Sequence, residues 1–94
     1  MTDIERSRIA LNLFESKILQ DSLTEGYYRW QDEKKYEDIK DYSVLFLKLI
    51  ESANCKFIEM TKRPFGFKVR IENAIYHYFI NASSIGYKGI REKN

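Results

Sequence analysis

Hydrophobic residues recur at helical spacing in the first half of the chain and at strand spacing in the second half. The longest apolar pattern predicts a helix over 33–53, with apolar side chains on about half of its surface and charged ones opposite. The apolar members are Tyr36, Ile39, Tyr42, Phe46, Leu47, Leu49, Ile50 and Ala53. Since this face is wider than a contact between two helices needs, we expect it to pack against both a sheet and another helix.

An earlier helix is predicted over 3–23, after a capping box formed by Thr2 and Glu5. Its main apolar face consists of Ile4, Ala10, Leu11, Phe14 and Ile18. Ile9 and Leu13 lie almost opposite that face in a regular helix. They fit either a surface for self-association or partner docking, or ordinary partial exposure.

An aromatic segment separates the two predicted helices. It runs from Gly26 to Gln31 and contains Tyr27, Tyr28 and Trp30 around one arginine. Such a group fits the closed end of a small core, and it also fits a stacking platform for a partner. The sequence leaves both interpretations open.

Alternation with period two begins at Cys55 and predicts strands over 55–61, 67–72 and 74–80. Pro64 and Gly66 suit a type I turn between the first two strands, and Asn73 suits a positive φ in the next turn. The segment 85–90 fits a short edge strand or a loop. We therefore predict an α+β fold with two N-terminal helices, then an antiparallel sheet of three or four strands, with the helices packed on one face.

Composition indicates one small folded domain, 1–94. A hydrophobic fraction of 44% with 14 aromatic residues is too high for a disordered chain. No apolar run approaches the roughly 18–20 residues of a membrane span, and no secretory signal is recognisable. The single cysteine excludes an internal disulfide and favours a cytoplasmic protein. Lys, Ile, Asn and Tyr make up 33 residues, a bias typical of an AT-rich genome such as that of a low-GC bacterium or a phage.

The sequence contains no recognisable catalytic or metal-binding motif. Cys55 and His77 are the only residues of their types, and a hydrolase pair formed by them would be close to a chance occurrence. Cys55 at a strand start is typical of a small buried side chain, and His77 lies mid-strand between apolar residues. We expect neither residue to be catalytic, and we expect no metal and no cofactor.

The second half of the chain carries the positive charge. Residues 1–53 have a net charge of −3, and residues 54–94 have a net charge of +5. The charge is concentrated on the predicted hairpin, whose candidate partner-binding residues are Lys62, Arg63, Lys68, Arg70, Tyr76 and Tyr78. Tyr76 and Tyr78 can share a face with Lys68 and Arg70 across the strand pairing, and we include them on that basis. Such a surface fits an acidic protein, a nucleic acid, or a sheet kept soluble by basic residues.

These patterns favour a small non-catalytic intracellular binding protein that associates stoichiometrically with a macromolecule, as a regulator or inhibitor. A protein partner with an acidic surface is the first expectation. Nucleic-acid binding through the basic hairpin is the alternative, and a small hydrolase or nuclease ranks third. Self-association through Ile9 and Leu13, giving a homodimer, is a separate hypothesis.

Overall fold

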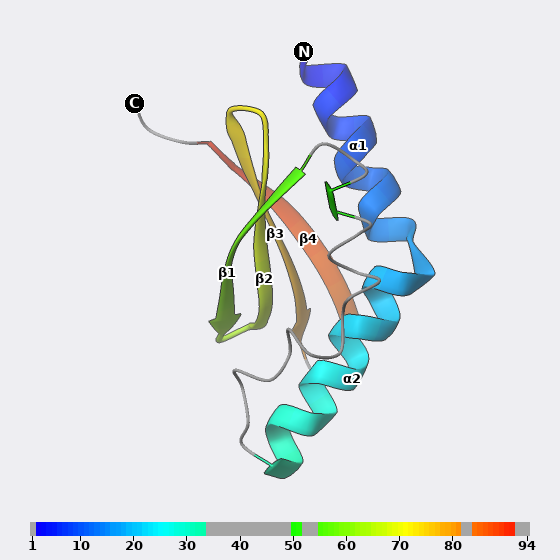
Figure 1. Cartoon of the computed structure of the whole chain (residues 1–94), viewed down its shortest axis with the longest axis vertical. Coiled ribbons are helices and arrows are strands. Elements are labelled where there is room, and N and C mark those ends of the chain that lie inside the picture. The colour runs from blue at the N-terminus through cyan, green and yellow to red at the C-terminus, as the bar shows by residue number, and fades with distance from the viewer. Residues whose placement is uncertain (1, 34–49, 52–54, 82–83, 92–94) are drawn as a thin grey trace.

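The computed structural model describes residues 2–33, 50–51, 55–81 and 84–91. Two helices run end to end along one side of a four-stranded antiparallel sheet (Figure 1). The elements are α1 (Asp3–Glu15), α2 (Lys17–Glu33), β1 (Cys55–Lys62), β2 (Phe65–Ile71), β3 (Ala74–Asn81) and β4 (Ser84–Arg91). The predicted α+β class is confirmed. Most of the predicted helix 33–53 lies outside the described residues, although Ile50 and Glu51 are helical and Ile50 is buried.

The predicted helix 3–23 is divided at Ser16. Ser16 is extended, with φ −64° and ψ 126°, and so ends α1. Its backbone N–H donates to Leu13 O (3.2 Å), and its carbonyl accepts from Gln20 N–H (3.1 Å) to begin α2. The Gln20 side chain donates to Phe14 O at 2.8 Å. Because these bonds occupy backbone groups that the break would otherwise leave unpaired, two helices replace one at little cost in hydrogen bonds.

The inward face of α1 differs in part from the predicted one. Leu13 is only 2% exposed and belongs to the core, and Ile9 packs against it. Ile4 is 72% exposed, and Leu11 is also exposed. The predicted main face is therefore confirmed for Ala10 and Phe14, which meet the core, and wrong for Ile4, Leu11 and Ile18, which are exposed. Helical spacing identifies apolar positions but not which of them meet the sheet. Leu13 in particular has no surface left for a second chain.

The aromatic segment predicted to join the helices lies inside α2. Tyr27 is half-buried, with its ring 6.0 Å from that of Phe65, whereas Tyr28 is 59% exposed. Tyr27 therefore contributes to the core, as one of the two interpretations proposed. The side chain of Trp30 lies outside the described part of the chain.

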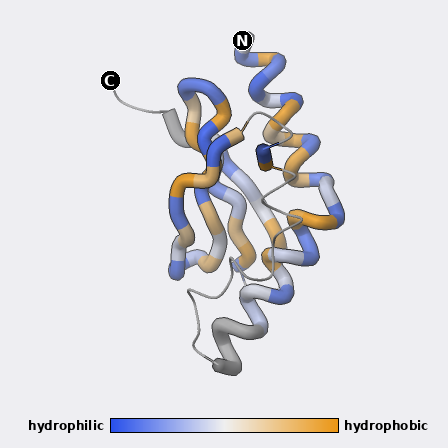
Figure 2. The backbone as a smooth tube through the Cα atoms, viewed as in Figure 1, coloured by the Kyte–Doolittle hydropathy of each residue, from blue (hydrophilic) through white to orange (hydrophobic). Residues whose placement is uncertain are grey.

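The sheet is a meander in which each strand pairs with the next along the chain, in the order β1-β2-β3-β4. The strand boundaries lie close to those predicted, and the segment 85–90 belongs to β4. Figure 2 shows hydrophobic and hydrophilic residues alternating along the strands, as expected for a sheet with one face on the core.

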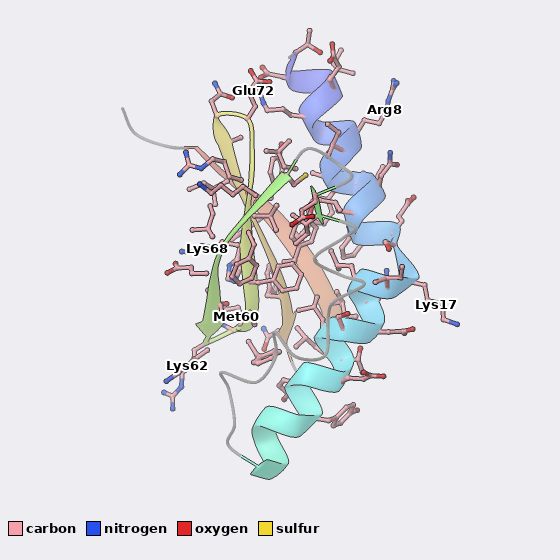
Figure 3. The ribbon with its side chains drawn as sticks, in the orientation of Figure 1. Arg8, Lys17, Met60, Lys62, Lys68 and Glu72 are labelled. Atoms are coloured by element: carbon pink, nitrogen blue, oxygen red, sulfur yellow. The ribbon has the colours of Figure 1, made fainter. Side chains whose placement is uncertain are left out.

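The turns differ from those predicted. Arg63 and Pro64 form the β1–β2 turn, joined by a cis peptide bond, one residue earlier than expected. In the β2–β3 turn the positive φ falls on Glu72 (57°) instead of Asn73. The carboxylate of Glu72 lies 3.9 Å from Arg6 of α1, so this turn and the start of α1 are neighbours (Figure 3).

A row of aromatic rings crosses the core side of the sheet. The ring centroids of Phe57 and Phe67 are 6.5 Å apart, those of Phe67 and Tyr78 are 5.8 Å apart, and those of Tyr78 and Tyr87 are 5.5 Å apart. Phe14 of α1 lies 4.7 Å from Tyr87 and continues the row onto the helix layer. Ring pairs at these distances add about 0.5–1.5 kcal/mol each beyond area burial, so the row ties the four strands to α1.

Tyr78 also makes a polar contact with the helix layer. Its buried hydroxyl donates a 2.7 Å hydrogen bond to Ala10 O. Burial raises the pKa of Tyr78 well above its usual value, which keeps the hydroxyl protonated as a donor. A directional bond of this kind fixes how α1 lies on β3.

Candidate interface on the outer face of the sheet

The strand register divides the sheet into two faces. Phe67 pairs with Tyr78 and Val69 with Tyr76, and these residues face the helices. Lys68 pairs with His77 and therefore faces away from the helices. Tyr76 and Tyr78 do not share a face with Lys68 and Arg70, so that prediction is wrong. Sequence alternation did not set the register between β2 and β3, and a shift of one residue exchanges the faces.

We define the outer face as the side of the sheet away from α1 and α2. By register its described side chains and the glycines between them are those of Lys56, Glu59, Thr61, Gly66, Lys68, Arg70, Ile75, His77, Phe79, Asn81, Ser84, Gly86 and Lys88. Four of these side chains are basic and one is acidic. In Figure 3, Lys68 points away from the helix layer, and Arg8 and Lys17 point away on the opposite side of the molecule.

A β-bulge in β1 sets the charges at one edge of this face. The pairing shifts between Phe57 and Glu59, so Ile58 is the extra residue. The shift brings Glu59 opposite Lys68, and their side chains form an ion pair of 3.2 Å. Adjacent apolar residues at 57 and 58 interrupt strict alternation, and this is the sequence signal for the bulge.

His77 lies at the centre of the outer face, yet it is only 5% exposed. Its Nε2 is 2.8 Å from Thr61 Oγ1, and the Thr61 hydroxyl donates to Pro64 O at 2.8 Å. A hydroxyl has one proton to donate, so His77 Nε2 must carry the proton in its own bond. Burial lowers the pKa of His77, and the nearby Lys68 and Lys88 lower it further. The imidazole is therefore held neutral at physiological pH, as a structural donor.

Phe79 is the aromatic residue of the outer face, half-buried and one strand from each of two glycines. A Cβ built on Gly86 would lie 3.1 Å from the tip of the Phe79 ring, so the ring rests over that glycine. On β2, a Cβ on Gly66 would lie 2.7 Å from the Cα of Phe79. Gly66 lets β2 and β3 approach closely, and Gly86 leaves room on β4 for the Phe79 ring.

Lys62 and Arg63, also predicted as binding residues, lie at the β1–β2 turn and are both exposed. The structure therefore separates the six predicted residues into three groups. Lys68 and Arg70 are on the outer face, Lys62 and Arg63 are at its end, and Tyr76 and Tyr78 are on the core side. Lys56, Lys88 and Phe79 were missed, although each follows from strand alternation once the register is known.

Cys55 and His77 are not brought together. Cys55 pairs with Ile71 on the core side of the sheet, whereas His77 is on the outer face. Burial raises the pKa of the Cys55 thiol to about 11. A thiol with this pKa stays protonated at neutral pH and is a poor nucleophile.

Among the residues that the structure describes, no cluster of three or more His, Cys, Asp or Glu side chains has the arrangement of a metal site. The same residues include no helix with the length and hydropathy to span a bilayer. No protein-family model, curated protein or solved structure matches the chain.

Proposed function

We propose that this chain is a non-catalytic binding protein that associates stoichiometrically with a macromolecule through the outer face of its sheet. The partner presents an acidic protein surface, and the protein acts in the cytoplasm as a regulator or inhibitor. The observation that carries the proposal is the excess of basic side chains on the sheet face opposite the helices. A face with an excess of positive charge favours a negatively charged partner and speeds its association.

The chemistry of His77 and Cys55 supports binding over catalysis. His77 Nε2–H is used in the bond to Thr61, and the lowered pKa keeps the ring neutral. Cys55 is on the other side of the sheet with a protonated thiol. A nucleophile and its base need to lie within about 2.6–3.2 Å of each other, and opposite faces of one sheet do not allow it.

An acidic protein is preferred because the outer face combines cations with apolar side chains of moderate exposure. Ile75 and Phe79 lie among the basic residues of neighbouring strands and are half-buried. Protein interfaces commonly place apolar anchors inside a charged rim, which sets orientation and association rate. Lys68 already has Glu59 as an intramolecular partner, so an acidic partner must compete with that carboxylate.

Nucleic acid is the second candidate, and Phe79 is the observation that favours it. Its ring lies beside Gly86, with Lys68 and Lys88 on the two flanking strands. Single-stranded nucleic acids bind to surfaces that combine aromatic rings for base stacking with cations for phosphates. Since Tyr76 and Tyr78 lie on the core side, this face offers one such ring in place of the two predicted.

The first experiment is an affinity capture from cell lysate, with and without nuclease, that compares a fourfold variant with a double variant. Lys56→Glu/Lys68→Glu/Arg70→Glu/Lys88→Glu reverses the outer face, and Arg8→Glu/Lys17→Glu is the control on the helix side. We expect nuclease-resistant capture of a protein in one-to-one ratio, lost in the first variant and kept in the second. Capture that both variants retain would refute the outer face as the binding surface.

The second experiment separates the two partner classes. Wild-type protein is titrated with labelled single- and double-stranded oligonucleotides from about 20 mM salt upward. We expect no binding if the partner is a protein. Binding with a log–log salt slope near −3, as roughly four phosphate contacts require, would instead establish nucleic acid as the partner.

A further inference from the structure

A cleft of about 320 Å³ lies at the end of the sheet, between the β1–β2 turn, the end of β3 and α2. The described residues that line it are Tyr27, Lys62, Arg63, Pro64, Phe65, Ile80 and Asn81. This volume is near the lower end of the range for small-ligand pockets, about 300–1,000 Å³. Tyr27, Phe65 and Ile80 place most of the cleft on the helix side of the sheet, and Asn81 lies where the cleft meets the end of the outer face.

The floor of the cleft is apolar. Phe65 and Ile80 are cross-strand partners on β2 and β3, and both are buried. Tyr27 of α2 is set edge-on to Phe65, with an interplanar angle of 63° and a centroid distance of 6.0 Å. Pro64 adds a ring with a fixed backbone φ. Phe65 and Ile80 form the base of the cleft, and the half-buried Tyr27 and Pro64 provide accessible surface for a ring or a short aliphatic group.

The rim of the cleft is cationic. Lys62 and Arg63 are adjacent in the turn and exposed, and Asn81 adds an amide at the end of β3. None of the seven described residues that line the cleft is acidic. In Figure 3, Lys62 lies at the β1–β2 end of the sheet, away from Lys68. An arginine beside a lysine suits an anionic oxygen group, since both donate charge-assisted hydrogen bonds.

We propose that this cleft binds a small amphipathic anion: an aromatic body on the floor, with one phosphate group at Lys62 and Arg63. The floor alone would accept a neutral ring, and the rim alone would accept inorganic phosphate. Their adjacency selects a ligand that carries both parts. This site is distinct from the proposed macromolecular interface, because none of the four basic outer-face residues is among the described residues that line the cleft.

The test is an NMR titration of ¹⁵N-labelled protein with phenyl phosphate, inorganic phosphate and phenol as three separate probes. We expect phenyl phosphate to cause saturable shifts of the Arg63, Phe65 and Asn81 amides, with a Kd of about 1 mM. Inorganic phosphate and phenol should each bind at least about tenfold more weakly. Equal affinity for inorganic phosphate, or no saturation by phenyl phosphate, would overturn the proposal.

Two variants locate the site. Lys62→Gln/Arg63→Gln changes exposed side chains, so it should leave the fold intact while weakening phenyl phosphate at least about tenfold. Lys68→Gln/Lys88→Gln is the matched control on the outer face and should leave the titration unchanged. If the control variant weakens binding as much as the first one, the phosphate binds the outer face and the cleft is not its site.

Discussion

Thr61 on β1 and His77 on β3 are joined by a 2.8 Å hydrogen bond that reaches across the strand between them. The residue of β2 that pairs with Thr61 is Gly66, which has no side chain to obstruct the contact. The bond to Pro64 O extends from the same hydroxyl to the β1–β2 turn. One threonine thus links a turn to the centre of the outer face, and it determines which imidazole nitrogen carries the proton.

The first prediction concerns pH. Because burial lowers the pKa of His77 in the folded protein, the unfolded chain binds more protons below about pH 6.5. His77 therefore contributes stability that is complete above that pH and is lost as the pH falls toward the lowered folded pKa. Urea unfolding from pH 5 to pH 8 should show this loss in the wild type. A His77→Gln variant should show a shallower slope, and an unchanged slope would contradict the prediction.

The second prediction concerns the tautomer. Thr61→Val removes the acceptor of His77 Nε2–H and the donor to Pro64 O, and should cost about 1–3 kcal/mol of unfolding free energy. Thr61→Ser keeps the hydroxyl and should recover most of it. Long-range ¹H–¹⁵N spectra of the wild type should show the Nε2–H form at neutral pH. An Nδ1–H form would mean that Thr61 donates to the ring instead.

The third prediction concerns the approach of β2 and β3 at Gly66. A Cβ there would meet backbone atoms of Tyr78 and Phe79, which have no freedom to move aside. Gly66→Ala should therefore lower the unfolding free energy by at least about 2 kcal/mol. Gly89→Ala is the matched control, because its Cβ would lie 3.2 Å from the side-chain ring of Tyr76. If the two variants melt at the same temperature, the close strand approach is not the reason for Gly66.

The fourth prediction concerns the hydroxyl of Tyr78. Tyr78→Phe keeps the ring in the aromatic row and removes only the bond to Ala10 O, so it should cost about 0.5–1.5 kcal/mol. Tyr78→Leu should cost more, since it also removes the ring contacts with Phe67 and Tyr87. The measurement is equilibrium denaturation. A neutral Tyr78→Phe would indicate that water replaces the bond readily.

Periodicity predicted the elements well where neighbouring residues alone decide them. The strands, the order of helices before strands and the α+β class follow from spacing, and so does the burial of Val69 and Ile71. The break at Ser16 did not follow, because serine is tolerated inside helices and the compensating bond comes from Gln20, four residues later. Helix propensities of single residues do not include such a side-chain contact, so they could not predict the break.

The candidate site was predicted in part. Lys68 and Arg70 were assigned to the solvent side of their strand correctly, since alternation within one strand is local. Tyr76 and Tyr78 were placed on the wrong face, because register between strands depends on turn geometry and on which face the helices cover. Ile9 is partly exposed, which was one of the two predicted alternatives, whereas Leu13 is in the core, because only the neighbours of an amphipathic helix decide which positions are buried.

The meander order of the strands also bears on how the chain reaches this structure. Every strand pairing joins consecutive segments, so the sheet forms through short loops whose closure costs little entropy. The bond from Tyr78 to Ala10 spans 68 residues, and closing so long a loop costs more. In kinetic terms, the hairpin contacts close short loops at small entropic cost, whereas the docking of α1 onto β3 and β4 closes the longest loops among these contacts.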